Sequence, residues 1–362
     1  MSNDILKAKN IAVIKKGKEI LNVNSFNLKE CSFTAVIGKN GAGKTTLMLA
    51  LATLMKLTSG ELWFKNKKIG GEISFEDFRR RIAIVFQDNL LLNETVFQNV
   101  AIGLKFRRVK GDEISCRVDN ILKLLRISHL RDRKPASLSG GEAKRVSIAR
   151  ALVIEPEILF LDEPFTSLDT VSKERIIIDM MEIIKDKKIS TILTTHDKYE
   201  ALRLSDYIVA LDEGRISQEG RKEDIINYPQ NSFVASFMGV ENIIEGVVIE
   251  ENEGGFVARA GDKLVEGVGD FKKGKKVLLC IRPENVFLSK NTHAVFSSVR
   301  NLFSGKVSEI NDYGYFYRIS VNCGFNIIAY ITKTSFYEMS IQVGDELSVG
   351  FKATSVHTIA EV

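Results

Sequence analysis

The chain has 362 residues, more than one ordinary domain holds, and we expect two or three domains. Its 44% hydrophobic and 27% charged residues are typical of a globular protein, and its net charge of +5 is spread along the chain, which argues against nucleic-acid binding. No apolar run is long enough for a membrane span, and the N-terminus lacks a signal-peptide pattern. Four cysteines lie far apart without a C-x-x-C pair, which favours a cytosolic protein without a structural metal.

Short strand-like and helix-like segments alternate through the first two thirds of the chain. Residues 94–130 show only helical spacing, which predicts a helical insert between two parts of an α/β core. Strands that alternate with helices predict a mostly parallel sheet. The expected strands are within 5–37 and at 61–64, 82–86, 158–161, 191–195 and 207–211, and the expected helices follow residue 46 and lie at 75–81, 142–154, 172–185 and 198–204.

A glycine-rich loop with the pattern G-x-x-x-x-G-K-T follows the apolar run 34–37 and precedes a helix. Glycines let successive backbone N–H groups surround a triphosphate, and the dipole of the following helix points at the same place. Lys44 would hold the β- and γ-phosphates, and the Thr45 hydroxyl would suit Mg²⁺. A loop that only turns a strand into a helix is the less favoured alternative. The expected nucleotide-binding residues are Gly38, Lys39, Asn40, Gly41, Ala42, Gly43, Lys44, Thr45 and Thr46.

Polar side chains follow three more of the expected strands. Ligands of an open parallel sheet bind beyond the carboxyl ends of its strands. We expect Asp162 to hold Mg²⁺ together with Gln87, and Glu163 to activate the attacking water as general base. We expect His196 to contact the γ-phosphate. Each residue alone could be an ordinary turn or surface group, but together the strand ends favour a Mg-triphosphate site.

A second phosphate site is expected where Ser139-Gly140-Gly141-Glu142 begins a helix. Ser139 and Glu142 have the spacing of a capping box, and the glycines expose a helix N-terminus that can bind an anion. Two half-sites in one chain favour a head-to-tail dimer, in which each serine-glycine helix closes over the other chain's glycine-rich loop. Asp169 would lie across that joint.

In these motifs and their order the chain resembles the ATP-binding subunit of an ABC transporter, over residues 5 to about 237. The resemblance implies a P-loop (RecA-like) α/β core, the cofactors ATP and Mg²⁺, and hydrolysis of ATP to ADP and phosphate with Lys44, Glu163 and His196 as catalytic residues. It also implies a homodimer at the cytoplasmic face of the membrane, docked on permease subunits near 94–130. The motifs are Walker A (38–45), the Q-loop residue Gln87, the signature (138–142), Walker B (158–162) with Glu163, the D-loop (167–169) and the switch residue His196.

Two positions depart from the family pattern. Glu142 stands where the family usually has glutamine. The segment 13–18 has no aromatic residue to stack on adenine, which could weaken ATP binding by about 1 kcal/mol. We expect adenine to rest on an aliphatic or lysine side chain instead.

The pattern changes near Gly239 to short alternating segments separated by Gly, Asn and Asp turns, which predict an all-β domain. We expect an ATPase domain at 1–239, with a helical subdomain at about 90–137, and an OB-like β domain at 240–362. Two stretches of the β domain, about 243–289 and 296–362, could each form a compact barrel.

Two parts of this C-terminal region resemble regulatory modules of importer subunits. Residues 281–284, Ile-Arg-Pro-Glu, are similar to a turn of the TOBE domain. The last segment, about 296–360, resembles the Mop module, which binds molybdate or tungstate. The similar pieces are 298–301, 305–307, 329–332, 344–345 and 351–354.

Four residues of the Mop-like segment would form an oxyanion site. Ser298, Arg300, Asn301 and Lys352 supply the hydrogen-bond donors that a tetrahedral dianion requires. The alternative is that the two cations are ordinary surface charges and that the barrel only dimerises.

The resemblance implies the ATPase subunit of a molybdate or tungstate importer, served indirectly by a substrate-binding protein. Another cargo, such as sulfate, iron, polyamine or sugar, is the alternative within transport. A soluble ATPase of repair or translation is disfavoured by the C-terminal barrel. A binding module without catalysis is disfavoured because Lys44, Asp162, Glu163 and His196 are all present.

Overall fold

The computed structural model describes residues 4–166, 168–290 and 298–360. The chain forms two compact units, Met1–Lys222 and Glu223–Val362. Residues 223–239, which we expected in the first domain, lie in the second unit. The functional division of the chain at residue 239 stays a prediction.

A four-stranded antiparallel sheet begins the first unit. Its strand order is β2-β1-β4-β5, and β1 pairs along almost its whole length with β2. Alternate side chains of β1 and β2 are buried, as expected for strands with one face on a core. The strands are β1 (Asp4–Lys15), β2 (Lys18–Lys29), β4 (Ser59–Phe64) and β5 (Lys67–Lys68).

A six-stranded sheet of order β10-β9-β3-β8-β7-β6 forms the centre of the first unit. The five strands from β9 to β6 are parallel, and β10 pairs antiparallel with β9. Every residue of β3, β7 and β8 is buried, which explains their continuous apolar sequences. The strands are β3 (Phe33–Ile37), β6 (Ile82–Val85), β7 (Ile158–Asp162), β8 (Ser190–Thr195), β9 (Tyr207–Asp212) and β10 (Arg215–Arg221).

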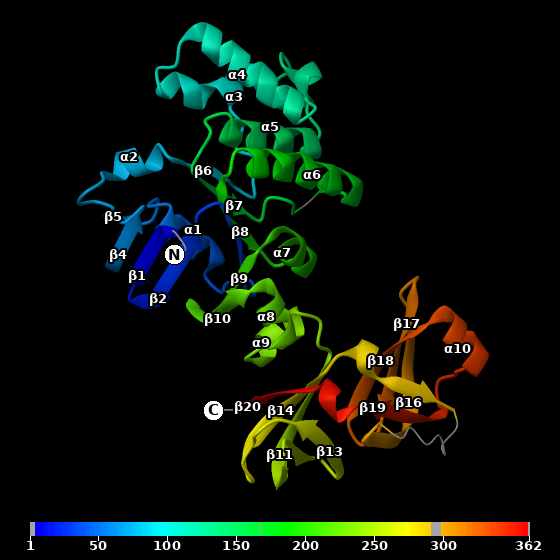
Figure 1. The fold of residues 1–362 in the computed structure, drawn as a ribbon. Coiled ribbons are helices and arrows are strands. Elements are labelled where there is room, and N and C mark those ends of the chain that lie inside the picture. The colour runs from blue at the N-terminus through cyan, green and yellow to red at the C-terminus, as the bar shows by residue number, and fades with distance from the viewer. Residues whose placement is uncertain (1–3, 167, 291–297, 361–362) are drawn as a thin grey trace. The chain divides into compact units, whose positions relative to one another are not determined.

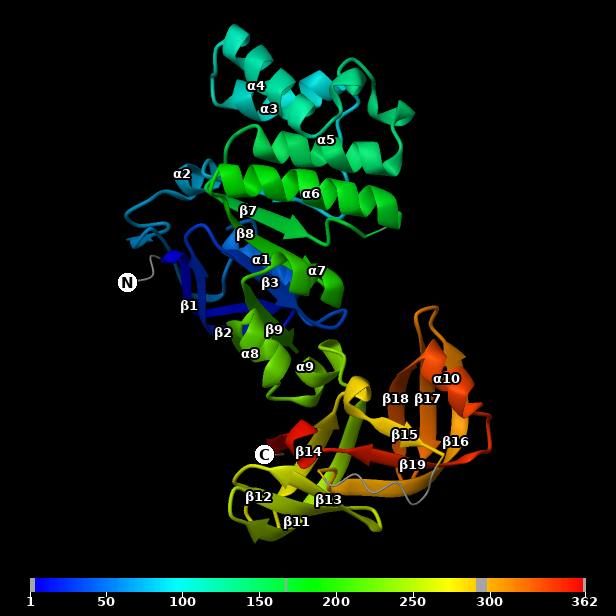
Figure 2. The same cartoon turned by 45° about the vertical axis from the view of Figure 1, so that its right-hand side comes forward.

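Helices make up the rest of the first unit. The predicted helical insert is confirmed as α3 and α4, and α5 and α6 lie between that pair and the parallel sheet (Figures 1 and 2). Their apolar faces share one core with β7. In the described residues no helix combines the length and apolar character of a membrane span. The helices are α1 (Lys44–Leu51), α2 (Phe75–Arg79), α3 (Val96–Phe106), α4 (Gly111–Leu124), α5 (Gly140–Leu152), α6 (Thr170–Asp186) and α7 (Lys198–Leu204), with 3₁₀ turns η1 (Ser128–Leu130) and η2 (Pro135–Ser137).

Three short helices and two antiparallel sheets form the described part of the second unit. The sheets have the orders β13-β12-β11-β14-β20 and β15-β19-β16-β17-β18, and they share one hydrophobic core. The expectation of an all-β region is confirmed except for the helix α10. The elements are α8 (Lys222–Asn227), α9 (Ser232–Phe237), β11 (Asn242–Asn252), β12 (Gly255–Ala260), β13 (Lys263–Val268), β14 (Lys276–Ile281), η3 (Pro283–Asn285), β15 (Phe287–Ser289), β16 (Asn301–Asp312), β17 (Phe316–Asn322), β18 (Asn326–Thr332), α10 (Lys333–Met339), β19 (Glu346–Phe351), η4 (Ala353–Ser355) and β20 (Val356–Ala360).

The second unit is built from two repeats that exchange their last strands. β11 to β14 and β16 to β19 follow the same pairing order, and each run ends in a 3₁₀ turn and a short strand. β15 pairs with β19, and β20 pairs with β14. The expectation of two separate barrels, at about 243–289 and 296–362, is therefore wrong, because each sheet takes one strand from the other stretch.

Candidate active site

The glycine-rich loop joins β3 to α1 and has the backbone that its sequence requires. Gly41 and Gly43 adopt positive φ angles of 83° and 99°, a region that L side chains rarely enter. A Cβ added to Gly38 would stand 2.6 Å from the Leu211 carbonyl oxygen. Lys39, Asn40 and Gly41 at the top of the loop are exposed, so their backbone can approach a ligand closely.

Lys44 opens α1 and is only 6% exposed. Its ammonium group donates hydrogen bonds to the carbonyl oxygens of Gly38, at 3.0 Å, and Lys39, at 3.2 Å. It also lies 3.5 Å from a carboxylate oxygen of Glu163. The cation is therefore held inside the curve of the loop, next to the end of β7, where a bound phosphate chain would meet it.

Thr45 and Asp162 meet at the end of β7. The Thr45 hydroxyl donates to the Asp162 carboxylate at 3.1 and 3.2 Å, and Thr194 of β8 donates to the same carboxylate at 2.5 Å. Asp162 is 7% exposed, and its two hydroxyl partners fix its orientation. A threonine hydroxyl and a carboxylate that converge beside a phosphate-binding loop are oxygen ligands of the type that Mg²⁺ prefers.

Glu163 links Lys44 to His196. Its other carboxylate oxygen lies 3.1 Å from Nδ1 of His196, which follows the end of β8 and is half exposed. Glu163 has a positive φ of 42°, and its N–H donates to the Thr194 carbonyl at 3.0 Å. A glutamate in this strained region costs about 1 to 2 kcal/mol, which is typical of functional positions.

Gln87, Ser139 and Asp169 lie on neighbouring elements, and in the described structure none of them forms a hydrogen bond or ion pair with Lys44 or Asp162. Gln87 is exposed just beyond β6, the strand next to β7. Ser139 caps α5 through the expected capping box with Glu142, and a Cβ added at Gly140 would meet nothing within 4 Å. Asp169 caps α6 by accepting the Ser172 N–H at 2.9 Å. Hydrogen bonds from the side chain and then from the backbone of Ser172 hold the pKa of Asp169 below its usual value.

Two residues that contact the predicted site residues were not predicted from the sequence. Thr194 orients Asp162, and its position, next to last in a strand that leads into the site, was the available signal. Lys144 of α5 is 2% exposed and donates to the carbonyl oxygen of Gln87 at 2.7 Å. A lysine in the middle of a helix gave no such signal.

The hairpin of β1 and β2 lies beside the glycine-rich loop. A Cβ added at Gly43 would stand 3.3 Å from the carbonyl oxygen of Ile20, and Ile14 faces Glu19 across the hairpin. The Ile14 side chain is 49% exposed. It is therefore an aliphatic surface near the loop that could support adenine.

The four predicted oxyanion residues of the second unit are not equivalent. Asn301 is 1% exposed, and its amide both donates to and accepts from the Glu266 backbone, at 2.9 and 2.7 Å. Its geometry therefore disagrees with the expected role as a free donor. Ser298, Arg300 and Lys352 are exposed, and Asn301 pairs with Phe351, so Arg300 and Lys352 flank the first pair of the β16–β19 ladder.

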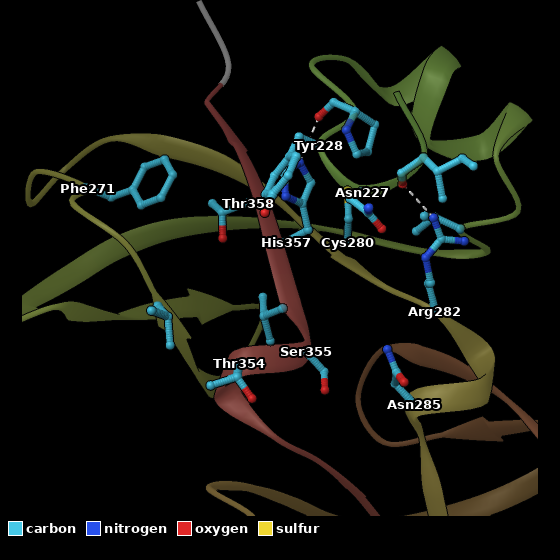
Figure 3. Close-up of a pocket in the computed structure, with 15 residues that line it drawn as sticks. Asn227, Tyr228, Phe271, Cys280, Arg282, Asn285, Thr354, Ser355, His357 and Thr358 are labelled. Carbon is cyan, nitrogen blue, oxygen red and sulfur yellow. Dashed lines mark hydrogen bonds between the residues drawn. The ribbon is translucent and has the colours of Figure 1, made fainter. Parts of the chain in front are cut away.

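A cavity of about 450 Å³ opens in the second unit. In Figure 3, Arg282 and Asn285 lie on one side of it, Phe271 on the opposite side, and Thr354 near its base. Burial raises the pKa of the Cys280 thiol in its wall to about 12, so the thiol stays neutral. None of the described lining residues is Asp or Glu, so the cavity suits a neutral or anionic ligand better than a cationic one.

Comparison with known proteins adds family information. A family model for the ABC transporter matches residues 21–166, and one for the TOBE domain matches 297–358. The chain is 36% identical to the molybdate/tungstate import ATP-binding protein WtpC of Pyrococcus horikoshii, over 92% of this chain and 94% of WtpC. It is 37% identical to the spermidine/putrescine import ATP-binding protein PotA of Clostridium novyi, over 79% of this chain and 81% of PotA. It also resembles the ATP-binding cassette MJ0796, solved as a dimer in a post-hydrolysis state with ADP and phosphate, with a TM-score of 0.55, 31% identity, and coverage of 60% of this chain and 98% of that one.

Proposed function

We propose a cargo for this protein from the premise that the chain belongs to the ATP-binding proteins of ABC transporters. The family resemblance drawn from the motifs is thereby confirmed, and the chain is an importer ATPase that converts ATP and water to ADP and phosphate. The cargo that we propose is molybdate or tungstate. The protein would act as a homodimer on permease subunits at the cytoplasmic face of the membrane.

The observation that carries the ATPase mechanism is the contact series from Lys44 through Glu163 to His196, beside Thr45 and Asp162. Lys44 would bind the β- and γ-phosphates, and Glu163 would accept the proton of the attacking water. His196 would hold the Glu163 carboxylate and contact the γ-phosphate.

Mg²⁺ fits the same residues. Thr45 and Asp162 would hold it with Gln87, and it would neutralise the charge of the β- and γ-phosphates. Ser139, Gly140 and Gly141 would complete the partner's nucleotide site from the open N-terminus of α5.

Uncompensated positive charge in the second unit supports an oxyanion as the cargo. Arg300 and Lys352 lie side by side along the β16–β19 register, and within the described part of the chain neither forms an ion pair. A polyamine would need carboxylates, and the cavity beside Arg282 has none among its described lining residues. We propose that the second unit senses the oxyanion through Ser298, Arg300 and Lys352, while Asn301 supports the fold.

Calorimetry on the full chain saturated with ADP tests this proposal, because ADP keeps oxyanions out of the phosphate-binding loop. Tungstate and molybdate should bind at micromolar concentration, whereas spermidine should not. Replacing both Arg300 and Lys352 by alanine should abolish the binding, and Lys272→Ala, which changes a lysine whose side chain is 90% exposed, should not. Binding of spermidine with no response to tungstate would favour polyamine import instead.

Glu163→Gln tests the mechanism. We expect the rate of phosphate release to fall by at least about 100-fold because the general base is lost. ATP should still bind, and size-exclusion chromatography should show an ATP-dependent dimer. Glu213→Gln, a change in an exposed turn, is the control. Near-normal turnover by Glu163→Gln would assign the base to another group.

A further inference from the structure

The ten-residue segment 86–95 connects β6 to α3 and carries Gln87 near its start. It has no helix or strand of its own. Seven of its carbonyl oxygens accept hydrogen bonds from only three side chains: two from Lys144, two from Arg150 and three from Asn99. Because these bonds go to the backbone, side chains on other elements determine the path of the segment.

Lys144 and Arg150 hold the first half of the segment. Lys144 donates to the carbonyl oxygens of Phe86 and Gln87, at 3.1 and 2.7 Å. Arg150 donates to those of Leu90 and Asn89, at 2.9 and 3.3 Å. Both cations come from α5, the helix that begins with the proposed second phosphate site.

Asn99 of α3 holds the second half. Its side chain is fully buried, and its amide donates to the carbonyl oxygens of Leu92, Glu94 and Thr95 at 3.0 to 3.1 Å. Its oxygen accepts the Leu92 N–H at 2.8 Å. The segment is thus bound at both ends to the helical part of the first unit.

Burying an ammonium group to bind a backbone carbonyl has a high desolvation free energy. Lys144 is 2% exposed, and burial lowers its pKa to about 8. In the described residues neither Lys144 nor Arg150 forms an ion pair. Both donate to backbone carbonyl oxygens, and the charge of Asp88 offsets part of the desolvation of Lys144. A hydrocarbon side chain would fill the same space at lower desolvation cost, which points to a role in placing the backbone.

We propose that Lys144 and Arg150 are positioning residues that fix Gln87 to α5. Lys144 donates to the carbonyl oxygen of Gln87 itself. A movement of α5 would therefore also change the direction of the Gln87 side chain. The same helix would present Ser139 to the partner's nucleotide. Through α5, the occupancy of one nucleotide site would then move Gln87 at the other. This inference rests on the proposed role of Gln87 as a ligand of the metal or the water.

Lys144→Met, Lys144→Gln and the control Lys123→Met, in the last turn of α4, test the proposal in the full-length protein. Lys144→Met should lower kcat about tenfold or more, because small misplacements of a catalytic group are costly. The KM for ATP should stay unchanged, because Lys144 donates its hydrogen bonds to the backbone beyond β6 and not to the phosphate-binding loop in the described structure. The Mg²⁺ concentration for half-maximal rate should rise. Lys144→Gln keeps N–H donors and should restore most of the rate.

Hydrogen exchange separates positioning from general destabilisation. Amides of 86–95 should exchange faster in Lys144→Met, with the rest of the unit unchanged. Normal exchange or a normal kcat in Lys144→Met would overturn the proposal. If Lys144→Met does not fold, Arg150→Lys replaces it, because the lysine leaves a donor for one of the two carbonyls. Arg150→Lys should give the same changes in kcat and hydrogen exchange more weakly. If it gives neither change, the proposal is overturned. Gln87→Ala separates a failure of this inference from a failure of the proposed function. If Gln87→Ala leaves the Mg²⁺ dependence of the rate unchanged, the proposed role of Gln87 is wrong.

Discussion

At the scale of single residues, adenine recognition is the weakest part of the nucleotide site. Ile14 offers a half-exposed aliphatic surface on the hairpin beside the loop. Ile14→Tyr should tighten ATP binding by about 1 kcal/mol through ring stacking, roughly fivefold in Kd. Fluorescence titration with a labelled ATP, competed by unlabelled ATP, measures the change. If the affinity for ATP is unaltered, the base lies elsewhere on the hairpin.

The hydroxyl group of Thr358 is buried and unsatisfied in the described structure. Thr358→Val keeps the shape of the side chain and removes the unsatisfied group, so it should stabilise the second unit by up to about 1 kcal/mol. Urea denaturation measures the shift, with Thr334→Val in α10 as the matched control. A loss of stability would mean that the hydroxyl has a partner in solution.

Sequence predicts residues that act through their own side chains better than residues that act on the backbone. Lys44, Asp162 and Glu163 follow from motif spacing, and the structure brings them together with His196. Lys144 has no comparable signal in the sequence. It binds backbone carbonyl groups, which every residue has, so no particular residue type marks its partner. For the same reason Asn301 was assigned to ligand binding although its amide binds the Glu266 backbone.

At the scale of elements, two asparagines at equivalent places tie the sheets of the second unit together. Asn242 begins β11 and pairs its amide with the Ile328 backbone, at 2.9 and 2.7 Å, as Asn301 does with Glu266. Either Asn→Ala change leaves a buried N–H and C=O unpaired. The free energy of unfolding of the second unit should fall by about 2 to 4 kcal/mol. Chemical denaturation measures it, and Asn311→Ala in β16 should change it little. Equal effects of all three changes would refute the role.

Periodicity predicted the parallel strands and most helices of the first unit, because these strands are buried runs and these helices have one apolar face. It did not predict the edge strands β5 and β10. It did not predict the exchange of β15 and β20. Both are short, and their partners β19 and β14 are equally apolar, so the sequence does not distinguish pairing within a repeat from pairing between repeats. The helix α10 was missed because none of its residues is fully buried, which leaves no apolar stripe.

At the scale of the whole molecule, the two units have separate hydrophobic cores. β20 closes the first sheet of the second unit against β14, so a chain that ends at Ser355 leaves β14 as an unprotected edge and loses Ile359 from the interior. Calorimetry of the intact chain should show two transitions, and ADP should raise only that of the first unit, because a ligand stabilises the fold that binds it. In the shortened chain the second transition should fall or vanish, whereas the ADP-sensitive one should keep its midpoint. If both transitions shift together, the units do not unfold independently, and regulation through the second unit would act on stability as well as on turnover.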